Sequence, residues 1–143
     1  MKFTRILTLA LAVAMLVLTM ASCGGAATTT VTLKITVPSE ADASVNEQIV
    51  DARIEVTGKN PTVLDVIAIA SERCDFQYTT NSSGTSVEEF AGYPRYTDEE
   101  TGINYSWYFT INEEEPSGSA ADNVVAADDV IEYIYVAYDP NEE

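Results

Sequence analysis

Apolar and polar residues alternate along several stretches of this chain, which is the pattern of strands that bury one face. Residues 31–37 (VTLKITV) and 105–112 (YSWYFTIN) alternate most regularly, and each predicts a half-buried strand. Residues 130–138 are apolar or aromatic on both faces, which favours a central strand. A shorter strand is predicted at 75–79. A further strand at 48–56 would point four residues inward: Val50, Ala52, Ile54 and Val56.

The segment from Thr62 to Arg73 has apolar positions that cover most of a helix rather than alternate. Thr62 followed three residues later by Asp65 is a variant of the capping box, and Asp65 also places a negative charge in the first turn. A short helix with this many apolar residues is expected to be buried. Those residues are Val63, Leu64, Val66, Ile67, Ile69 and Ala70. Because several of them are β-branched, a buried strand is the alternative.

The order of these elements is two strands, one helix and then several strands. This order predicts an α+β, β-grasp-like fold in which one helix packs on a mixed sheet of four to six strands. A small sandwich is the alternative if the segment is not helical. Residues 31–140 suit one domain, and 141–143 form a tail. Residues 89–96 are compatible with a short strand that ends in an aromatic loop.

The start of the chain has the features of a secretory leader. Two basic residues precede an uncharged, apolar run at 6–20, which predicts a signal peptide over residues 1–22. The sequence Met20-Ala21-Ser22-Cys23 resembles a bacterial lipobox, so Cys23 is the expected lipidation site and 23–30 a lipidated tether. The alternative is an ordinary signal peptide with an incidental cysteine. We therefore expect an extracytoplasmic protein that a lipid anchor holds to the bacterial cell membrane.

The remaining chain is strongly acidic. The formal net charge is −16, and loss of the two basic residues of the leader would bring it to −18. This charge argues against nucleic acid and against anionic lipid headgroups as partners. Solubility outside the cell is the simpler reason for the charge, and attraction of cations or basic partners is the alternative.

The inventory of reactive side chains is small. The chain has no histidine, and Cys74 would be the one remaining thiol, expected as a small buried side chain after the helix. We therefore predict no catalytic residues and no enzyme activity. The acidic segment 98–102 lacks the ligand spacing of an EF-hand, so we interpret it as an acidic turn and predict no metal site. Asp128 and Asp129 could join another loop in space, and adventitious calcium is the alternative.

Aromatic residues are the main candidates for recognition. Within the strand at 105–112, Trp107, Phe109 and Ile111 would face the helix, so Trp107 is expected in the core more than in a ligand site. Tyr108 would lie on the opposite face. Tyrosines suit recognition because a flat ring and a hydroxyl come at low entropic cost. The candidate ligand-binding residues are Tyr93, Tyr96, Tyr105, Trp107 and Tyr108. The alternative is that the neighbouring loops cover these rings and form a second core.

Three short motifs occur in the order found in one known family. Thr62-Val63-Leu64-Asp65, the strand 107–112 (WYFTIN) and the segment 129–133 (DVIEY) resemble motifs of the transcobalamin-like C-terminal domain, which bacterial lipoproteins of unknown function also carry. Three residues depart from the pattern: Glu113 and Asp128 stand where the family has glycine, and Tyr133 where it has tryptophan.

The resemblance implies a β-grasp-type domain and a ligand. Animal relatives form the smaller domain of cobalamin carriers, whose larger helical domain supplies the other half of the pocket. The implied function is a small-molecule binding module whose candidate ligand is cobalamin or another corrinoid, with no separate cofactor. The alternative is a non-catalytic cell-surface module whose partner is a protein or a glycan. Either function would involve the membrane only through the lipid anchor.

Overall fold

The computed structural model describes residues 26–38 and 47–141, and this part of the chain holds one helix and eight strands. The predicted signal peptide and Cys23 lie outside the described residues. The elements, in chain order, are β1 (Thr28–Val37), β2 (Glu47–Thr57), α2 (Val63–Cys74), β3 (Tyr78–Thr80), β4 (Val87–Phe90), β5 (Tyr93–Pro94), β6 (Tyr96–Thr97), β7 (Asn104–Ile111) and β8 (Val130–Tyr138).

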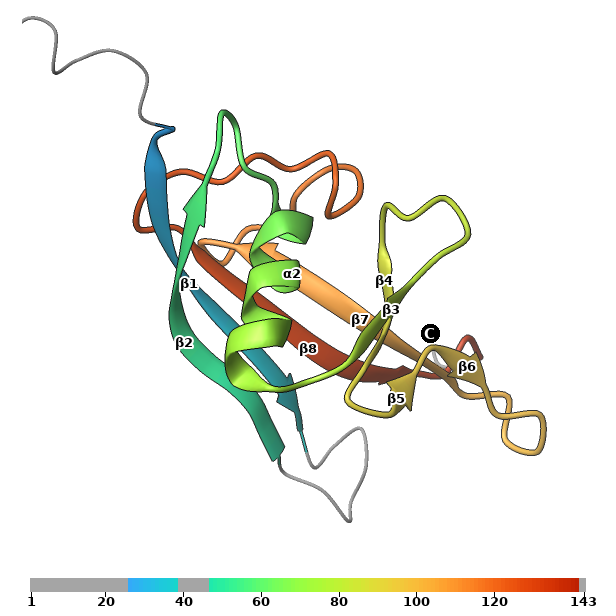
Figure 1. The fold of residues 1–143 in the computed structure, drawn as a ribbon. Helices are drawn as coiled ribbons and strands as arrows, with labels where there is room; N and C mark the ends of the chain where they lie inside the picture. The colour runs from blue at the N-terminus through green and yellow to red at the C-terminus, as the bar shows by residue number, and fades with distance from the viewer. Residues whose placement is uncertain (1–25, 39–46, 142–143) are drawn as a thin grey trace, which may run out of the picture.

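The strands form a large sheet and a small one. The large sheet has the order β2-β1-β8-β7-β6, in which β1 and β8 run parallel and the other neighbours run antiparallel (Figure 1). The small sheet has the order β3-β4-β5. The predicted α+β class, with one helix on a mixed sheet, is therefore confirmed. The narrower assignment to a β-grasp fold stays a prediction.

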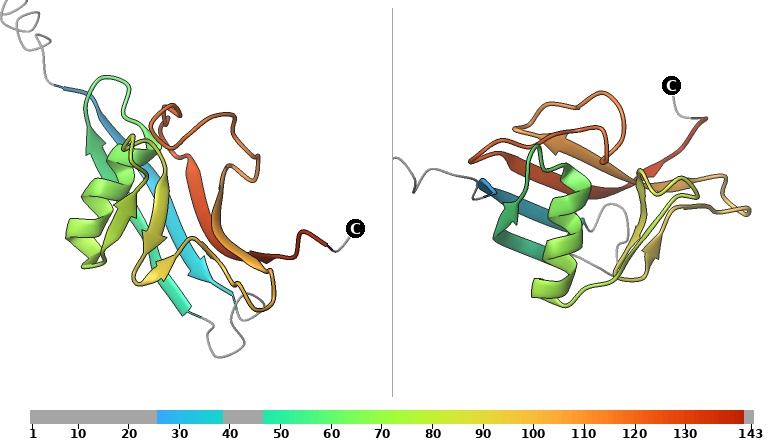
Figure 2. Two further views of the ribbon diagram at one scale, coloured as in Figure 1. Left: turned by 90° about the vertical axis from the view of Figure 1, so that its right-hand side faces the viewer. Right: turned by 45° about the horizontal axis from the view of Figure 1, so that its top comes forward.

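The helix and the small sheet lie on the same side of the large sheet. Helix α2 packs against β1 and β2, while β4 of the small sheet contacts β7 (Figure 2). The predicted inward residues of the first two strands are buried, except that Ala52 is only partly so. The core on the helix side is almost entirely aliphatic and consists of Val31, Leu33, Ile35, Val50, Ile54, Val56, Val63, Val66, Ile67 and Ala70.

Helix α2 begins with the predicted capping box. The Thr62 hydroxyl accepts a hydrogen bond from the Asp65 backbone N–H at 3.3 Å, and the Asp65 carboxylate accepts one from the Thr62 N–H at 2.8 Å. These two bonds satisfy amide groups that have no partner within the helix. The helical interpretation of this segment is confirmed, and the alternative of a buried strand is wrong.

Two predictions about the end of the helix are wrong. Cys74 is the last helical residue and is exposed, because its position falls on the solvent side of the helix. The strand predicted at 75–79 begins only at Tyr78, since Asp75 caps the helix in the left-handed conformation (φ 55°) and Phe76 turns into the core.

Strand β1 begins three residues earlier than predicted, because Thr28–Thr30 pair with β2 where a tether was predicted.

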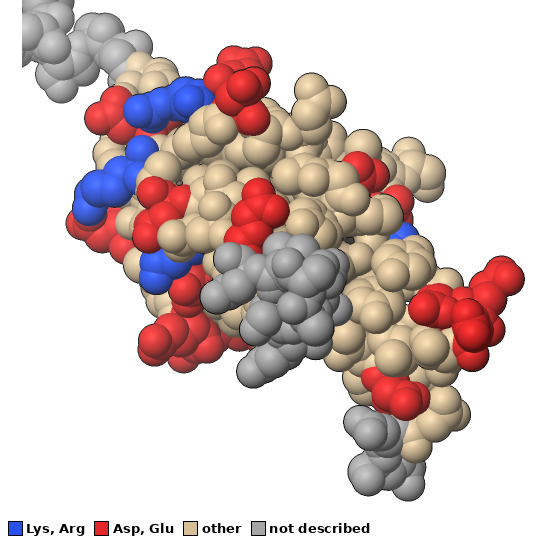
Figure 3. All heavy atoms as spheres, turned by 90° about the horizontal axis from the view of Figure 1, so that it is seen from below, with Lys and Arg blue, Asp and Glu red and all other residues tan. Residues whose placement is uncertain are grey.

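Acidic side chains are spread over the molecular surface. Figure 3 shows Asp and Glu scattered over one face, whereas the Lys and Arg side chains gather toward one end of it. Within the described residues there are two ion pairs, Lys34 with Glu132 at 3.1 Å and Arg53 with Asp128 at 3.0 Å. Both are partly or largely exposed, so each stabilises the fold only weakly.

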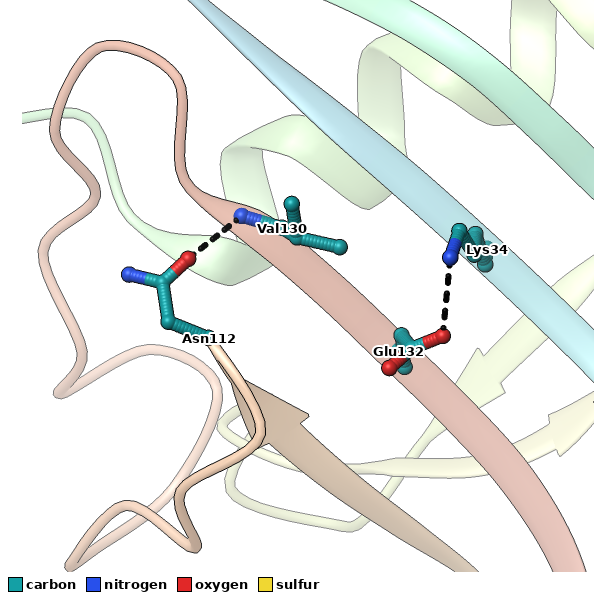
Figure 4. Close-up of polar contacts among 4 residues, drawn as sticks. All are labelled: Lys34, Asn112, Val130 and Glu132. Carbon is teal, nitrogen blue, oxygen red and sulfur yellow. Dashed lines mark hydrogen bonds and ion pairs between the residues drawn. The ribbon is translucent and has the colours of Figure 1, made fainter.

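The ends of β7 and β8 are joined through Asn112. Its side-chain oxygen accepts a hydrogen bond from the Val130 N–H at 2.9 Å (Figure 4). The backbone N–H of Asn112 donates to the Val130 carbonyl at 2.8 Å. The Asn112 amide also donates to Asp129 at 2.8 Å. Glu113 and Asp128 both adopt positive φ (68° and 67°), the left-handed conformation that favours glycine. These motif residues therefore have a structural role.

Candidate functional site

A continuous series of aromatic rings lines the inner face of the large sheet beyond the helix. Phe90, from the small sheet, packs edge-on against Trp107 at 4.9 Å and against Tyr133 at 5.0 Å between ring centroids. Trp107 in turn lies 5.0 Å from Tyr135. The series ends at Tyr105, which contacts Tyr135 at 6.0 Å. Edge-to-face and stacked pairs of this kind stabilise the fold beyond the area that they bury.

The series opens into a cleft at the end of the sheet where β6, β7 and β8 meet. The Tyr96 and Tyr105 rings stack there at 4.8 Å with an angle of 5° between their planes, because the two residues face each other across β6 and β7. The cleft has a volume of 510 Å³. Its lining residues are Arg95, Tyr96, Thr97, Asn104, Tyr105, Ser106 and Tyr138.

Three hydrogen bonds hold the chain around this cleft. The Trp107 indole N–H donates to the Tyr93 carbonyl at 2.8 Å, and the Tyr135 hydroxyl donates to the Pro94 carbonyl at 2.7 Å. The Thr97 hydroxyl donates to the Asn104 side-chain oxygen at 2.6 Å. Rings of the core thus hold the backbone of β5, the strand that directly precedes Arg95 and Tyr96 of the cleft.

The predicted ligand-binding residues divide into three groups. Tyr96 and Tyr105 line the cleft. Tyr93 and Trp107 lie in the aromatic series, and the Tyr93 hydroxyl donates to Glu47 at 3.3 Å. Tyr108 lies on the opposite face of the sheet and is 38% exposed. Desolvation raises the pKa of Tyr108, and the nearby Glu115 carboxylate raises it further by a smaller amount.

The sequence interpretation missed five of the seven residues that line the cleft, which are Arg95, Thr97, Asn104, Ser106 and Tyr138. Tyr138, at the end of β8, is 59% exposed and lies opposite Asn104 of β7. Arg95 is a basic residue between Pro94 and Tyr96 in an acidic chain, and this isolated positive charge could have identified it as a candidate ligand-binding residue. The contribution of Asn104 had no local signal, because only the pairing of β6, β7 and β8 places it in the cleft.

A second hollow of 550 Å³ lies between the start of β2 and the end of α2. Glu47, Asp75 and Glu89 line it, together with the exposed Cys74. Its one aromatic residue, Phe76, is itself part of the core. The aromatic cleft therefore offers the better surface for recognition of a ring or another apolar group.

The acidic turn before β7 binds its own backbone. One Asp98 carboxylate oxygen accepts hydrogen bonds from the N–H groups of Glu100 at 2.9 Å and Thr101 at 3.1 Å. Both bonds lower the pKa of Asp98, and the bond from Thr101 has the larger effect.

Within residues 26–38 and 47–141, no group of three or more Cys, Asp or Glu is placed to hold a metal ion. Among the described residues, no helix is both long and apolar enough to cross a membrane.

Comparison with known proteins gives a likeness of fold. No family model and no curated protein matches the chain. Among solved structures, the chain is similar to part of haptocorrin in complex with Cbi, with a TM-score of 0.59 and 17% identity. The match covers 80% of this chain and 26% of the haptocorrin chain, so the chain corresponds to about a quarter of that protein.

A second solved structure is more distant. It is a putative metal binding protein from Ruminococcus gnavus, with 12% identity and a TM-score of 0.47 over 77% of this chain and 98% of the other. Of these two structures, only haptocorrin bears on the fold, and the likeness supports a transcobalamin-like fold.

Proposed function

We propose that this chain is a membrane-anchored extracytoplasmic lipoprotein that binds a small molecule in the aromatic cleft. The observation that carries the proposal is the cleft itself, with the stacked pair of Tyr96 and Tyr105 in its wall. The transcobalamin-like fold supports a binding function and agrees with a β-grasp domain. The lipobox-like sequence that ends at Cys23 supports the anchor.

The chemistry of the cleft suits a ligand with both apolar and polar parts. Its volume of 510 Å³ falls within the range of about 300–1,000 Å³ that is usual for small-molecule sites. Tyr105 and Tyr138 offer ring surface, while Arg95 and Asn104 offer hydrogen-bond donors. The chain has no histidine to act as a base for a nucleophile. A non-catalytic binding role is therefore proposed.

The candidate ligand is cobalamin or another corrinoid, as the motif resemblance implies. The haptocorrin structure that resembles this chain is a complex with Cbi. Because this chain corresponds to 26% of haptocorrin, we expect it to contact a corrinoid from one side only. A partner protein would then complete the site.

A binding measurement tests this proposal directly. Corrinoids absorb visible light, so equilibrium dialysis of purified protein against cobinamide would report binding without a label. We expect Tyr96→Ala and Tyr138→Ala to weaken binding, because each removes a ring from the cleft. Tyr108→Ala is the matched control, since its ring lies on the opposite face. No retention at high micromolar corrinoid would overturn the corrinoid assignment.

The anchor needs a test of its own. Labelled palmitate supplied to producing cells should enter the protein and should be absent from a Cys23→Ser variant. Equal labelling of the two proteins would contradict lipidation at Cys23.

One observation favours a second function, a surface module that binds a protein or a glycan. Tyr108 and Ile134 face each other across β7 and β8 on the face of the large sheet opposite the helix, and both are more than a third exposed. If this face carries the function, Tyr108→Ala will impair partner capture while Tyr96→Ala will not. The Tyr96→Ala and Tyr108→Ala variants therefore distinguish the two functions, because each function predicts that only one of them loses binding.

A further inference from the structure

A small pocket lies next to the aromatic cleft, between β4, β7 and the loop at 118–120. Its volume is 180 Å³. Tyr133 lines this pocket and is 2% exposed, and its buried hydroxyl has no hydrogen-bond partner. An unpaired buried hydroxyl group costs free energy of folding. We call this space the Tyr133 pocket.

Each polar side chain around the Tyr133 pocket can donate a hydrogen bond. Ser86, Ser106 and Arg95 line it with Tyr133, while Trp107 and Phe109 supply apolar wall. None of its lining residues carries a carboxylate, although the whole chain is strongly acidic. The Ser119 hydroxyl is already bonded to Asp122 at 2.6 Å, so it is not available to a ligand.

Arg95 connects the Tyr133 pocket with the surface. It is exposed, it lines both the Tyr133 pocket and the aromatic cleft, and its backbone N–H is fixed on the Glu88 carbonyl at 2.7 Å. Neither of the two ion pairs of the described residues includes Arg95. The Arg95 guanidinium can therefore form charge-assisted hydrogen bonds with the oxygen atoms of an anion. The hydroxyl groups of Tyr133, Ser86 and Ser106 can donate further hydrogen bonds to the same anion.

We propose that the Tyr133 pocket binds a small oxyanion, either free or as the carboxylate or phosphate end of a larger ligand. In this arrangement the Tyr133 hydroxyl donates to one oxygen and the Arg95 guanidinium pairs with the charge. The pocket shares only Arg95 and Ser106 with the lining of the cleft, and it can be tested with simple ions. The proposal therefore does not rest on the corrinoid or on the function of the cleft.

The experiment is an NMR titration of the purified protein with acetate and, separately, with inorganic phosphate. Sodium chloride at matched ionic strength is the reference. We expect saturable shifts at the Trp107 indole N–H and at the backbone amides of Ser86 and Ser106. A response to acetate alone assigns the site to carboxylates, and a response to phosphate alone assigns it to phosphates.

Two variants and one control decide whether the named groups hold the ion. Arg95→Gln should weaken binding about tenfold or more, because a charge-assisted hydrogen bond is lost. Tyr133→Phe should also weaken it, while the melting temperature without anion stays equal or rises, since the removed hydroxyl had no partner. Arg73→Gln, which changes an exposed arginine at the end of α2, should leave binding unchanged.

Three results would overturn the proposal. The first is the absence of saturable shifts with either ion, which would leave the pocket to water only. The second is equal binding by the wild type and by the Arg95→Gln variant. The third is a clear fall in the melting temperature of Tyr133→Phe without anion, because the hydroxyl would then already have a partner in the folded protein.

Discussion

The two halves of the large sheet are built from different side chains. Where α2 covers β1 and β2, the core consists of aliphatic residues such as Leu33 and Ile67, both with 0% exposure. Where the small sheet covers β7 and β8, the core consists of aromatic rings. Several of these rings carry polar groups, such as the Trp107 indole N–H and the Tyr135 hydroxyl, and both donate to backbone carbonyls.

This difference explains why the candidate sites lie in only one half. Aliphatic packing is non-directional and leaves no polar group to recognise a ligand. Aromatic residues with polar tips need a specific partner, and they combine ring surface with hydrogen bonding. The Tyr133 hydroxyl lacks such a partner, and burial raises the pKa of Tyr133 far above its ordinary value. The helical half supports the fold, and the aromatic half offers surfaces for ligands.

The largest effect is expected from the removal of a ring in the aromatic half. Trp107→Ala should lower the free energy of unfolding by about 3–5 kcal/mol, because Trp107 contacts Phe90 and Tyr135 and fixes the Tyr93 carbonyl. Chemical denaturation measures this loss. Trp107→Phe is the control that keeps a ring but removes the N–H donor. An unchanged stability with lost ligand binding would show that Trp107 serves the ligand rather than the core.

A smaller effect is expected at the start of the helical half. Thr62→Ala should lower the free energy of unfolding by about 1 kcal/mol, because one of the two capping-box bonds is lost. Urea unfolding of the variant measures this change, and Thr62→Ser, which keeps the hydroxyl, should stay close to the wild type. A loss as large as that of Trp107→Ala would mean that the two halves do not differ in the way described.

The smallest expected effect is on the pH dependence of stability, and it comes from Asp98 in the acidic turn before β7. Backbone N–H groups lower the pKa of Asp98 below its ordinary value of 3.8. The ionised group therefore stabilises the folded state above that value, and this contribution is lost as the pH falls through the lower folded-state pKa. Between about pH 5 and about pH 2, the range in which such a carboxyl group titrates, Asp98→Asn should lose less stability than the wild type. Parallel melting curves for the two proteins would contradict this prediction.

Local patterns predicted most of the secondary structure. Alternation identified β1, β2 and β7, and the capping box at Thr62 and Asp65 identified the start of α2, because each signal involves residues only a few positions apart. The prediction that Cys74 is buried failed for a related reason. Its exposure depends on the last turn of the helix and on the left-handed Asp75, which no apolar pattern marks.

The candidate site was only partly predictable. Tyrosine content pointed to Tyr96 and Tyr105, and the structure places both in the cleft. The alternation of the strand at 105–112 predicted Tyr108 on the opposite face, and the register of β7 with β8 places it there, away from the cleft. The sequence interpretation missed Tyr138 because β8 lies some thirty residues beyond Tyr105 along the chain, and only strand pairing brings the two ends together.

The sequence by itself determined the elements of this protein and the strongly acidic character of its surface. Alternation and helix capping are short-range effects, and net charge needs no structure at all. Tertiary structure alone decided where the aromatic rings lie, which of them reach the surface, and that Tyr133 is left without a partner. The physical reason is that a cleft or a pocket is the space between elements, and the pairing of β8 with both β1 and β7 sets that space.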